Sequence, residues 1–227
     1  MLINHTKKYV YIRVPKTGST SFESQLIEDT GNDDVVHTNI PFCKIQGKNW
    51  DYSEQQENFK FTVNKSHLTY SQILQLINFD ISTYEIYGVL RDPVDRFLSQ
   101  AYHNEYVQPD DDNSTIRPAN ITLTNNQLVE KWFNVVKNNF DINSHLFKPQ
   151  TDWLLHDNQP INNIFLYEDL SLLMQKLTGD SVLRYNYRNQ ARENKNYDDL
   201  DQGLKQELIQ LYQADHDLYT SLKNKTI

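Results

Sequence analysis

The segment from Tyr9 to Phe22 restricts the fold of this chain more than any other, because it combines a strand, a tight turn and a helix. The strand ends at Pro15, and a helix begins near Ser19 with Phe22 and Leu26 on its buried face. Such a junction directs unpaired backbone N–H groups and the positive end of a helix dipole at one point. The segment therefore predicts an anion-binding site.

The side chains of the turn agree with that prediction. Gly18 permits unusual backbone angles and close approach, and Lys16 brings a compact, movable positive charge. Additional hydroxyl donors are Thr17, Ser19, Thr20 and Ser21. The alternative is a Ser/Thr-rich helix cap with a surface lysine. The turn is not a Walker A loop, because the pattern G-x-x-x-x-G-K-[ST] occurs nowhere in the chain.

Short apolar runs alternate with amphipathic helical patterns along the rest of the chain. The expected strands are Lys8–Val14, Phe59–Val63, Glu85–Leu90 and Ile164–Tyr167, with Val35–Thr38 as a further candidate. The expected helices are Pro93–Tyr106, Asn125–Phe140 and Leu200–Leu222. This alternation predicts an α/β fold, a P-loop-like three-layer sandwich with a central, mainly parallel sheet flanked by helices. We expect one domain over residues 1–227, in which about residues 105–145 form a variable insertion that includes the acidic loop Asp110–Pro118.

Composition excludes several classes of protein. A net charge of −8 argues against nucleic-acid binding, which requires a basic surface. No apolar run is long enough for a signal peptide or a membrane span, so we expect a soluble, cytoplasmic protein. Cys43 is the one cysteine, so an internal disulfide and a cysteine-built zinc site are both excluded. We expect no metal site, and we interpret His216 between Asp215 and Asp217 as part of a solvated helix face.

A second stretch, Leu90–Ser99, also contains residues suited to anions. Asp92 is suited as the N-cap of a helix and Pro93 as its first residue. Helix-start chemistry does not explain Arg91 at the end of an apolar strand, or Ser99 two turns later. Ligands of parallel sheets lie at the carboxyl ends of strands, so we expect Arg91 beside the Lys16 turn, with Ser99 on a shared phosphate. For Arg96 we expect an exposed side chain paired with a nearby carboxylate.

These two motifs resemble those of the sulfotransferases that use 3′-phosphoadenosine 5′-phosphosulfate (PAPS). The sequence VPKTGSTS at Val14–Ser21 is similar to their 5′-phosphosulfate loop, and LRDPVDRFLS at Leu90–Ser99 to their 3′-phosphate strand and helix. Motif order and separation resemble the carbohydrate branch, the heparan 2-O and chondroitin/dermatan sulfotransferases. Further similarity lies in Phe147–Leu154, Ile164–Leu170 and Leu211–Tyr219, so that about residues 105–145 are unmatched.

The resemblance implies roles for single residues. Lys16 and the Thr17–Ser21 loop would hold the 5′ end of PAPS, while Arg91 and Ser99 would hold its 3′-phosphate. The product would be adenosine 3′,5′-bisphosphate. One departure is Ala191, which stands where family members commonly have the serine of an Asn-x-Ser element. A cofactor contact from that segment is therefore open, although Arg188 or Arg192 would supply charge there.

Sulfuryl transfer to a hydroxyl needs a base and a group that stabilises the leaving phosphate. The sulfuryl group has less negative charge than a phosphoryl group, so Lys16 suffices for the second role without a metal. Among seven histidines, His67 has the best context for the base, directly beyond a predicted strand and between the two anion motifs. His37 is the reserve candidate and Glu23 the third. Lys65 is interpreted as a solvated lysine.

Two other functions compete with this interpretation. The first is a P-loop kinase for a nucleotide or small metabolite, with Asp92 as its magnesium-binding carboxylate. The missing Walker sequence and the N-cap role of Asp92 count against it. The second is a catalytically silent nucleotide-binding or assembly module. It is disfavoured by the presence together of Lys16, His67, Arg91 and Ser99. The acceptor is expected to be a carbohydrate, with a tyrosine or a small-molecule hydroxyl open, and the sequence predicts no oligomeric state.

Overall fold

The computed structural model describes residues 1–31, 33–36, 67–106, 123–138, 147–182 and 197–225 of the chain. The chain divides into two compact units. The first consists of residues 1–90 and 150–187, and the second of residues 91–149 and 188–227. The expectation of one domain over residues 1–227 stays a prediction.

The first unit is built on a five-stranded sheet with the order β3-β1-β2-β4-β7. Its strands are β1 (Leu2–Asn4), β2 (Tyr9–Ile12), β3 (Val35–Val36), β4 (Glu85–Leu90) and β7 (Asn163–Leu166). Strand β2 pairs in parallel with β4, and β4 in parallel with β7. Strand β1 is antiparallel to both β2 and β3, so it alone runs against the other strands of this sheet. The prediction of a mainly parallel sheet is confirmed.

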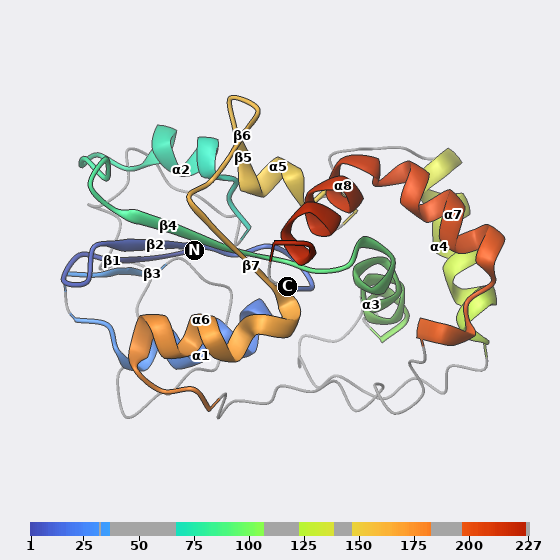
Figure 1. Ribbon diagram of the computed structural model, residues 1–227, viewed down its shortest axis with the longest axis horizontal. Coiled ribbons are helices and arrows are strands. Elements are labelled where there is room, and N and C mark those ends of the chain that lie inside the picture. Colours follow the sequence, from blue (N-terminus) through green and yellow to red (C-terminus); the bar gives the residue numbers. More distant parts are fainter. Residues whose placement is uncertain (32, 37–66, 107–122, 139–146, 183–196, 226–227) are drawn as a thin grey trace. The chain divides into compact units, whose positions relative to one another are not determined.

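Helices lie on both faces of this sheet, as a three-layer α/β sandwich requires (Figure 1). Helices α1 (Ser19–Glu28) and α6 (Leu170–Thr178) contact each other on one face. Helices α2 (Tyr70–Leu76) and α5 (Thr151–Leu154) contact each other on the opposite face. A small hairpin, β5 (Leu155–His156) and β6 (Gln159–Pro160), follows α5, and a 3₁₀ turn at Tyr167–Asp169 connects β7 to α6.

Alternate residues of the central strands supply the two faces of the sheet. Tyr87 and Val89 of β4 join a buried cluster with Phe22 and Leu26 of α1. Gly88, between them, faces the other side, where an added Cβ would lie 2.3 Å from Leu154 Cδ2. Gly88 therefore permits α5 to approach the sheet closely.

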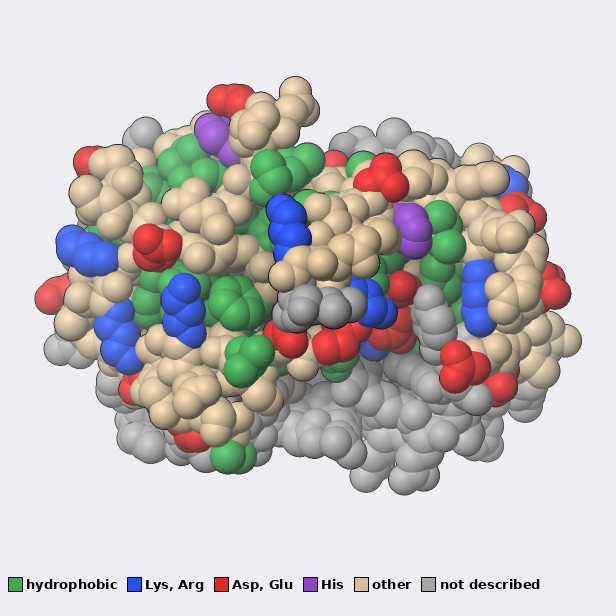
Figure 2. Space-filling model, viewed as in Figure 1, with side chains coloured by type: hydrophobic (Ala, Val, Ile, Leu, Met, Phe, Trp, Pro, Cys, Tyr) green, Lys and Arg blue, Asp and Glu red, His purple; other side chains and the backbone are tan. Residues whose placement is uncertain are grey.

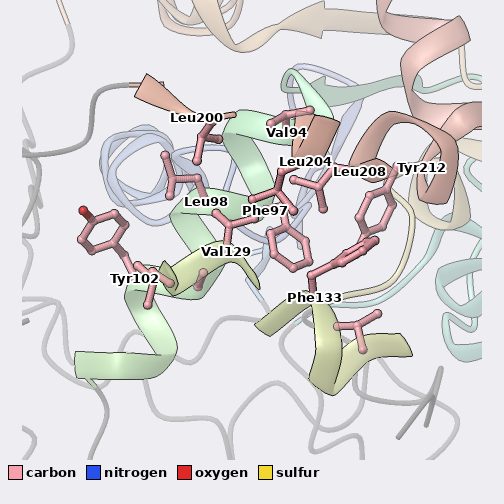
Figure 3. Close-up of a cluster of buried hydrophobic side chains, with 13 residues drawn as sticks. Val94, Phe97, Leu98, Tyr102, Val129, Phe133, Leu200, Leu204, Leu208 and Tyr212 are labelled. Atoms are coloured by element: carbon pink, nitrogen blue, oxygen red, sulfur yellow. The ribbon is translucent and has the colours of Figure 1, made fainter. Parts of the chain in front are cut away.

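The second unit is helical, and its core is drawn in Figure 3. Its helices are α3 (Pro93–Tyr106), α4 (Asn125–Asn138), α7 (Gln202–Leu211) and α8 (Gln213–Lys223), with a 3₁₀ turn at Tyr197–Asp199. Helices α3, α4 and α7 contact one another in pairs. Phe97, Val129, Phe133 and Leu208 lie in the buried cluster between them. The amphipathic helix α3 contributes five residues to this cluster, Val94, Phe97, Leu98, Ala101 and Tyr102.

Several expected elements are present, whereas β1, α2, α5, α6 and the hairpin of β5 and β6 were not predicted. Strands Glu85–Leu90 and helix Pro93–Tyr106 have the expected bounds, and β7 begins and ends one residue early. The expected single helix Leu200–Leu222 is instead two helices that meet at Tyr212. Tyr212 is buried, and its hydroxyl donates to the Phe147 carbonyl at 2.8 Å. This hydrogen bond anchors the residue at which the two helices meet. The expected strand Phe59–Val63 lies outside the described residues.

Charges of both signs are mixed on the surface that Figure 2 presents. Lys and Arg side chains and Asp and Glu side chains are scattered over the described part of that face. Among the helices of the described residues, none has the length and apolar character that crossing a membrane would require.

Candidate functional site

The turn after β2 has the backbone of an anion site. Lys16 has a φ of 64° and Gly18 a φ of 73°, both in the left-handed region. Left-handed backbone at a lysine is strained, and such strain is concentrated at functional positions. The fully buried Thr17 closes the turn, because its hydroxyl donates to the Val14 carbonyl at 2.9 Å. The proton of the Thr17 hydroxyl is thus used within the turn.

Helix α1 begins directly after Gly18, which is its N-cap. Gly18 has no side chain to cap the first turn of the helix, so an anion can take that place. An added Cβ on Gly18 would lie 3.0 Å from Tyr167 Cε2 and 3.2 Å from Leu170 Cδ1. Both the positive φ and this close packing require glycine. The start of α1 thus has the backbone that an anion site requires.

The hydroxyls of the first helical turn differ in what they can donate. Ser19 is buried at the start of α1, and Ser21 is half-buried. The hydroxyl oxygen of Thr20 accepts a hydrogen bond from Arg13 Nη2 at 3.0 Å. Since that bond occupies an acceptor position, the Thr20 hydroxyl proton remains able to donate to an anion.

Arg13 is a site residue that the sequence analysis missed. It directly follows β2, and its Nη1 forms an ion pair with Glu23 Oε2 at 3.2 Å. Glu23 is fully buried in α1, and its other oxygen accepts from the main-chain nitrogen of Met1 at 3.0 Å. Burial, reinforced by the charge of Glu23, raises the pKa of the neighbouring Tyr11 hydroxyl. The signal in the sequence was an arginine at the end of an apolar strand, the same signal that pointed to Arg91.

His67 is brought to the same end of the sheet as the turn. Its Nδ1 lies 3.0 Å from the Arg13 carbonyl oxygen, and its own carbonyl accepts from Trp153 Nε1 at 3.1 Å. A carbonyl oxygen only accepts, so Nδ1 is the donor in this contact, and in the neutral ring the lone pair is on Nε2. That neutral tautomer is the one that a general base needs. The reserve candidate His37 lies outside the described residues, and the third candidate, Glu23, is the buried partner of Arg13.

The second motif follows β4, the parallel neighbour of β2. Arg91 comes directly after the last residue of β4, and its Nε donates to Asp95 Oδ2 at 2.5 Å. Asp92 Oδ1 accepts from the backbone nitrogens of Val94 and Asp95, at 2.9 and 3.0 Å, which confirms Asp92 as the N-cap. Ser99 is buried on α3. Both motifs thus follow the carboxyl ends of adjacent parallel strands, the ends at which ligands of such sheets lie.

Two expectations about charged side chains in the helical unit are wrong. Arg96 is not an exposed arginine on a carboxylate, because only 1% of it is exposed. It donates to the Lys148 carbonyl at 2.8 Å and lies over the Tyr212 ring at 5.3 Å. Asp215 is fully buried rather than part of a solvated face. Each lies on a helix side that packs inward, which the local pattern of charges did not indicate.

Several candidates cannot be placed in the structure. Cys43 and Lys65 lie outside the described residues, as do the segment around Ala191 and its flanking arginines Arg188 and Arg192. Within the described residues, no group of three or more His, Cys, Asp or Glu side chains is arranged to hold a metal ion.

A mainly parallel α/β sheet with an anion turn after its central strand β2 defines a class of proteins that bind nucleotides and other phosphate-containing ligands. Comparison with known families is more specific, since the sulfotransferase family matches residues 1–220. The chain therefore belongs to the sulfotransferase family, whose members are enzymes that use PAPS as the sulfuryl donor. The match covers parts of both units and selects no particular branch of the family. No curated protein and no solved structure matches the chain significantly.

Proposed function

We propose that this enzyme transfers a sulfuryl group from PAPS to a hydroxyl of a carbohydrate, with His67 as the general base and Lys16 as the stabilising cation. The observation that supports this most directly is the hydrogen bond from His67 Nδ1 to the Arg13 carbonyl, 3.0 Å long. This contact supports the assignment, because it joins His67 to the residue that opens the turn and favours the tautomer that has the Nε2 lone pair.

The two anion motifs would divide the donor between them. Lys16, the backbone N–H groups of Thr17–Ser21 and the Thr20 hydroxyl would bind the 5′ end of PAPS. Arg91 and Ser99 would bind its 3′-phosphate, since a guanidinium with a hydroxyl is suited to the oxygens of a phosphate. Thr17 would contribute through its backbone, because its hydroxyl proton is already donated to Val14.

The donor and the protein have separate roles in the reaction. PAPS supplies a sulfuryl group that is transferred by in-line displacement, with a phosphate as the leaving group. His67 Nε2 accepts the proton of the acceptor hydroxyl. Lys16 balances the negative charge that grows on the leaving oxygen, so this scheme requires no metal ion. The left-handed φ angles of Lys16 and Gly18 set the path of the turn, so the Lys16 backbone would be in place before the reaction begins.

The carbohydrate acceptor and the single-domain organisation belong to the same proposal. The order and spacing of the motifs, which resemble the polysaccharide-modifying sulfotransferases, support a carbohydrate. Since one family match covers residues 1–220, we propose that residues 1–227 act as one sulfotransferase domain. Of the expected insertion at about residues 105–145, residues 107–122 and 139–145 lie outside the described residues. Labelled sulfate transfer to heparan, chondroitin and a tyrosine peptide, side by side, tests the acceptor class.

The donor class is tested by calorimetric binding of adenosine 3′,5′-bisphosphate, run beside ATP with magnesium. We expect metal-independent binding of the bisphosphate and no comparable binding of ATP. Arg91→Ala should weaken bisphosphate binding by about 1.5–3 kcal/mol, the contribution of a hydrogen bond to a charged group. Preference for ATP would overturn the sulfotransferase proposal in favour of a kinase, and binding of neither would favour a silent module.

The base is tested by turnover. His67→Ala should lower kcat by roughly 10²–10⁴-fold while bisphosphate affinity stays unchanged. The matched control is His156→Ala, because His156 is also a half-exposed histidine of the first unit and is hydrogen-bonded to Ser71. Full turnover in His67→Ala would contradict the assignment of the base and leave the donor assignment standing.

A further inference from the structure

His67 lies in a segment with no regular secondary structure, so its position depends on individual contacts. It forms a bend three residues before α2, and the capping box of Thr69 and Gln72 fixes the chain only beyond it. Two contacts of His67 itself reach other elements: the ring contacts the residue after β2, and the backbone carbonyl contacts α5. These contacts tie the bend to two separate parts of the first unit.

The ring contact has a rigid partner. The Arg13 carbonyl belongs to the residue directly after a buried strand, and the Arg13 side chain is held by Thr20 at 3.0 Å and Glu23 at 3.2 Å. Since Glu23 is fully buried, this ion pair resists exchange with solvent. The Arg13 carbonyl accepts the hydrogen bond from His67 Nδ1, and the Arg13 side chain is anchored to Thr20 and Glu23.

The backbone contact has an equally fixed partner. Trp153 is 1% exposed, and its indole N–H donates to the His67 carbonyl at 3.1 Å. A buried indole N–H without a partner is unfavourable, so the bond is strongly favoured. Trp153 lies in α5, which contacts α2, the helix that follows the bend.

We infer that Trp153 is a positioning residue, which acts with the Arg13 carbonyl as a two-point clamp that holds His67 in the Nδ1–H tautomer. The clamp is defined by these two hydrogen bonds, Trp153 Nε1 to the His67 carbonyl and His67 Nδ1 to the Arg13 carbonyl. Without the first bond, the His67 backbone can move, the ring leaves the Arg13 carbonyl, and the proton distributes over both ring nitrogens. This inference rests on the proposed catalytic role of His67.

The experiment is ¹⁵N NMR of the His67 imidazole in the full chain, with kcat and KM measured on the same samples. Wild type should show the Nδ1–H tautomer. Trp153→Phe, which keeps an aromatic ring and removes the donor, should shift both nitrogens toward the averaged values of two tautomers. We expect kcat to fall roughly tenfold, as for other residues that orient a functional histidine, with the KM for PAPS unchanged.

Trp132→Phe is the matched control, because the Trp132 indole N–H is also a hydrogen-bond donor, but it donates to the Glu105 side chain at 2.9 Å in the helical unit. It should leave the His67 signals and kcat unchanged. Two results would overturn the inference: an Nε2–H tautomer in wild type, or His67 signals in Trp153→Phe that equal those of wild type. The wild-type tautomer can overturn the inference even when Trp153→Phe does not fold. Full turnover in His67→Ala would instead contradict the catalytic role, while the NMR result still tests the clamp.

Discussion

Two arginines occupy equivalent places in the chain, directly after the adjacent parallel strands β2 and β4, yet their carboxylate partners differ. Arg13 pairs with Glu23 in α1, where the two side chains are 7% and 0% exposed. Arg91 pairs with Asp95 in α3, where they are 8% and 32% exposed. The guanidinium groups are similarly buried, so the contrast lies in the acids.

This contrast separates a structural arginine from one able to bind a ligand. The Glu23 carboxylate has been removed from water, so its ion pair is lost only at a large free-energy penalty. Asp95 remains partly in water, where it can be solvated while a phosphate takes over the Arg91 guanidinium. In the proposed function, Arg13 would shape the anion turn, whereas Arg91 would exchange its partner for a ligand.

The largest effect is expected from breaking the buried pair. Glu23→Gln leaves the Arg13 charge without its partner in the interior, and we expect the free energy of unfolding to fall by about 3–5 kcal/mol. Urea unfolding, followed by circular dichroism, measures this loss. A loss below about 1 kcal/mol, as for an exposed pair, would show that Arg13 finds solvent or another acid, and would remove the distinction between the two arginines.

Substitution of Gly18 tests the turn itself, and substitution of Gly179, which also has a positive φ but lies outside the turn, is the control. Gly18→Ala introduces left-handed strain and a Cβ only 3.0 Å from Tyr167, so we expect a loss of stability of about 2 kcal/mol or more. Gly179 has a φ of +85° and open space at the Cβ position, so Gly179→Ala isolates the strain, about 1 kcal/mol. Chemical unfolding of both variants measures the difference.

Binding distinguishes the two glycines further. Gly18→Ala should also weaken bisphosphate binding, because the start of α1 shifts, whereas Gly179→Ala, at the end of α6, should not. Equal losses of stability in the two variants would contradict the importance of the contact with Tyr167 and Leu170. Unchanged bisphosphate affinity in Gly18→Ala would contradict the assignment of this turn to the ligand.

The sequence predicted the parts of the site that depend on neighbouring residues. The turn at Gly18, the helix cap at Asp92 and the strand before Arg91 follow from local rules, and the structure agrees with each. The contacts of Arg13 and Trp153 could not be predicted, because their partners are distant along the chain. His67, for example, is 54 residues from Arg13 and 86 from Trp153. Burial of Arg96 and Asp215 was missed for the same reason.

The smallest effect is expected at the partner of Arg91, where the proposed exchange can be tested directly. Asp95→Asn removes an acid that is one-third exposed, so we expect a change in stability of no more than about 1 kcal/mol. Bisphosphate affinity should rise, because a phosphate no longer competes with Asp95 for the guanidinium and no longer meets its negative charge. Calorimetry at two salt concentrations measures both the gain and its expected decrease on screening. A loss of affinity as large as that of Arg91→Ala would instead mean that Asp95 orients Arg91 for its ligand, so that the pair acts together and the acid is not exchanged.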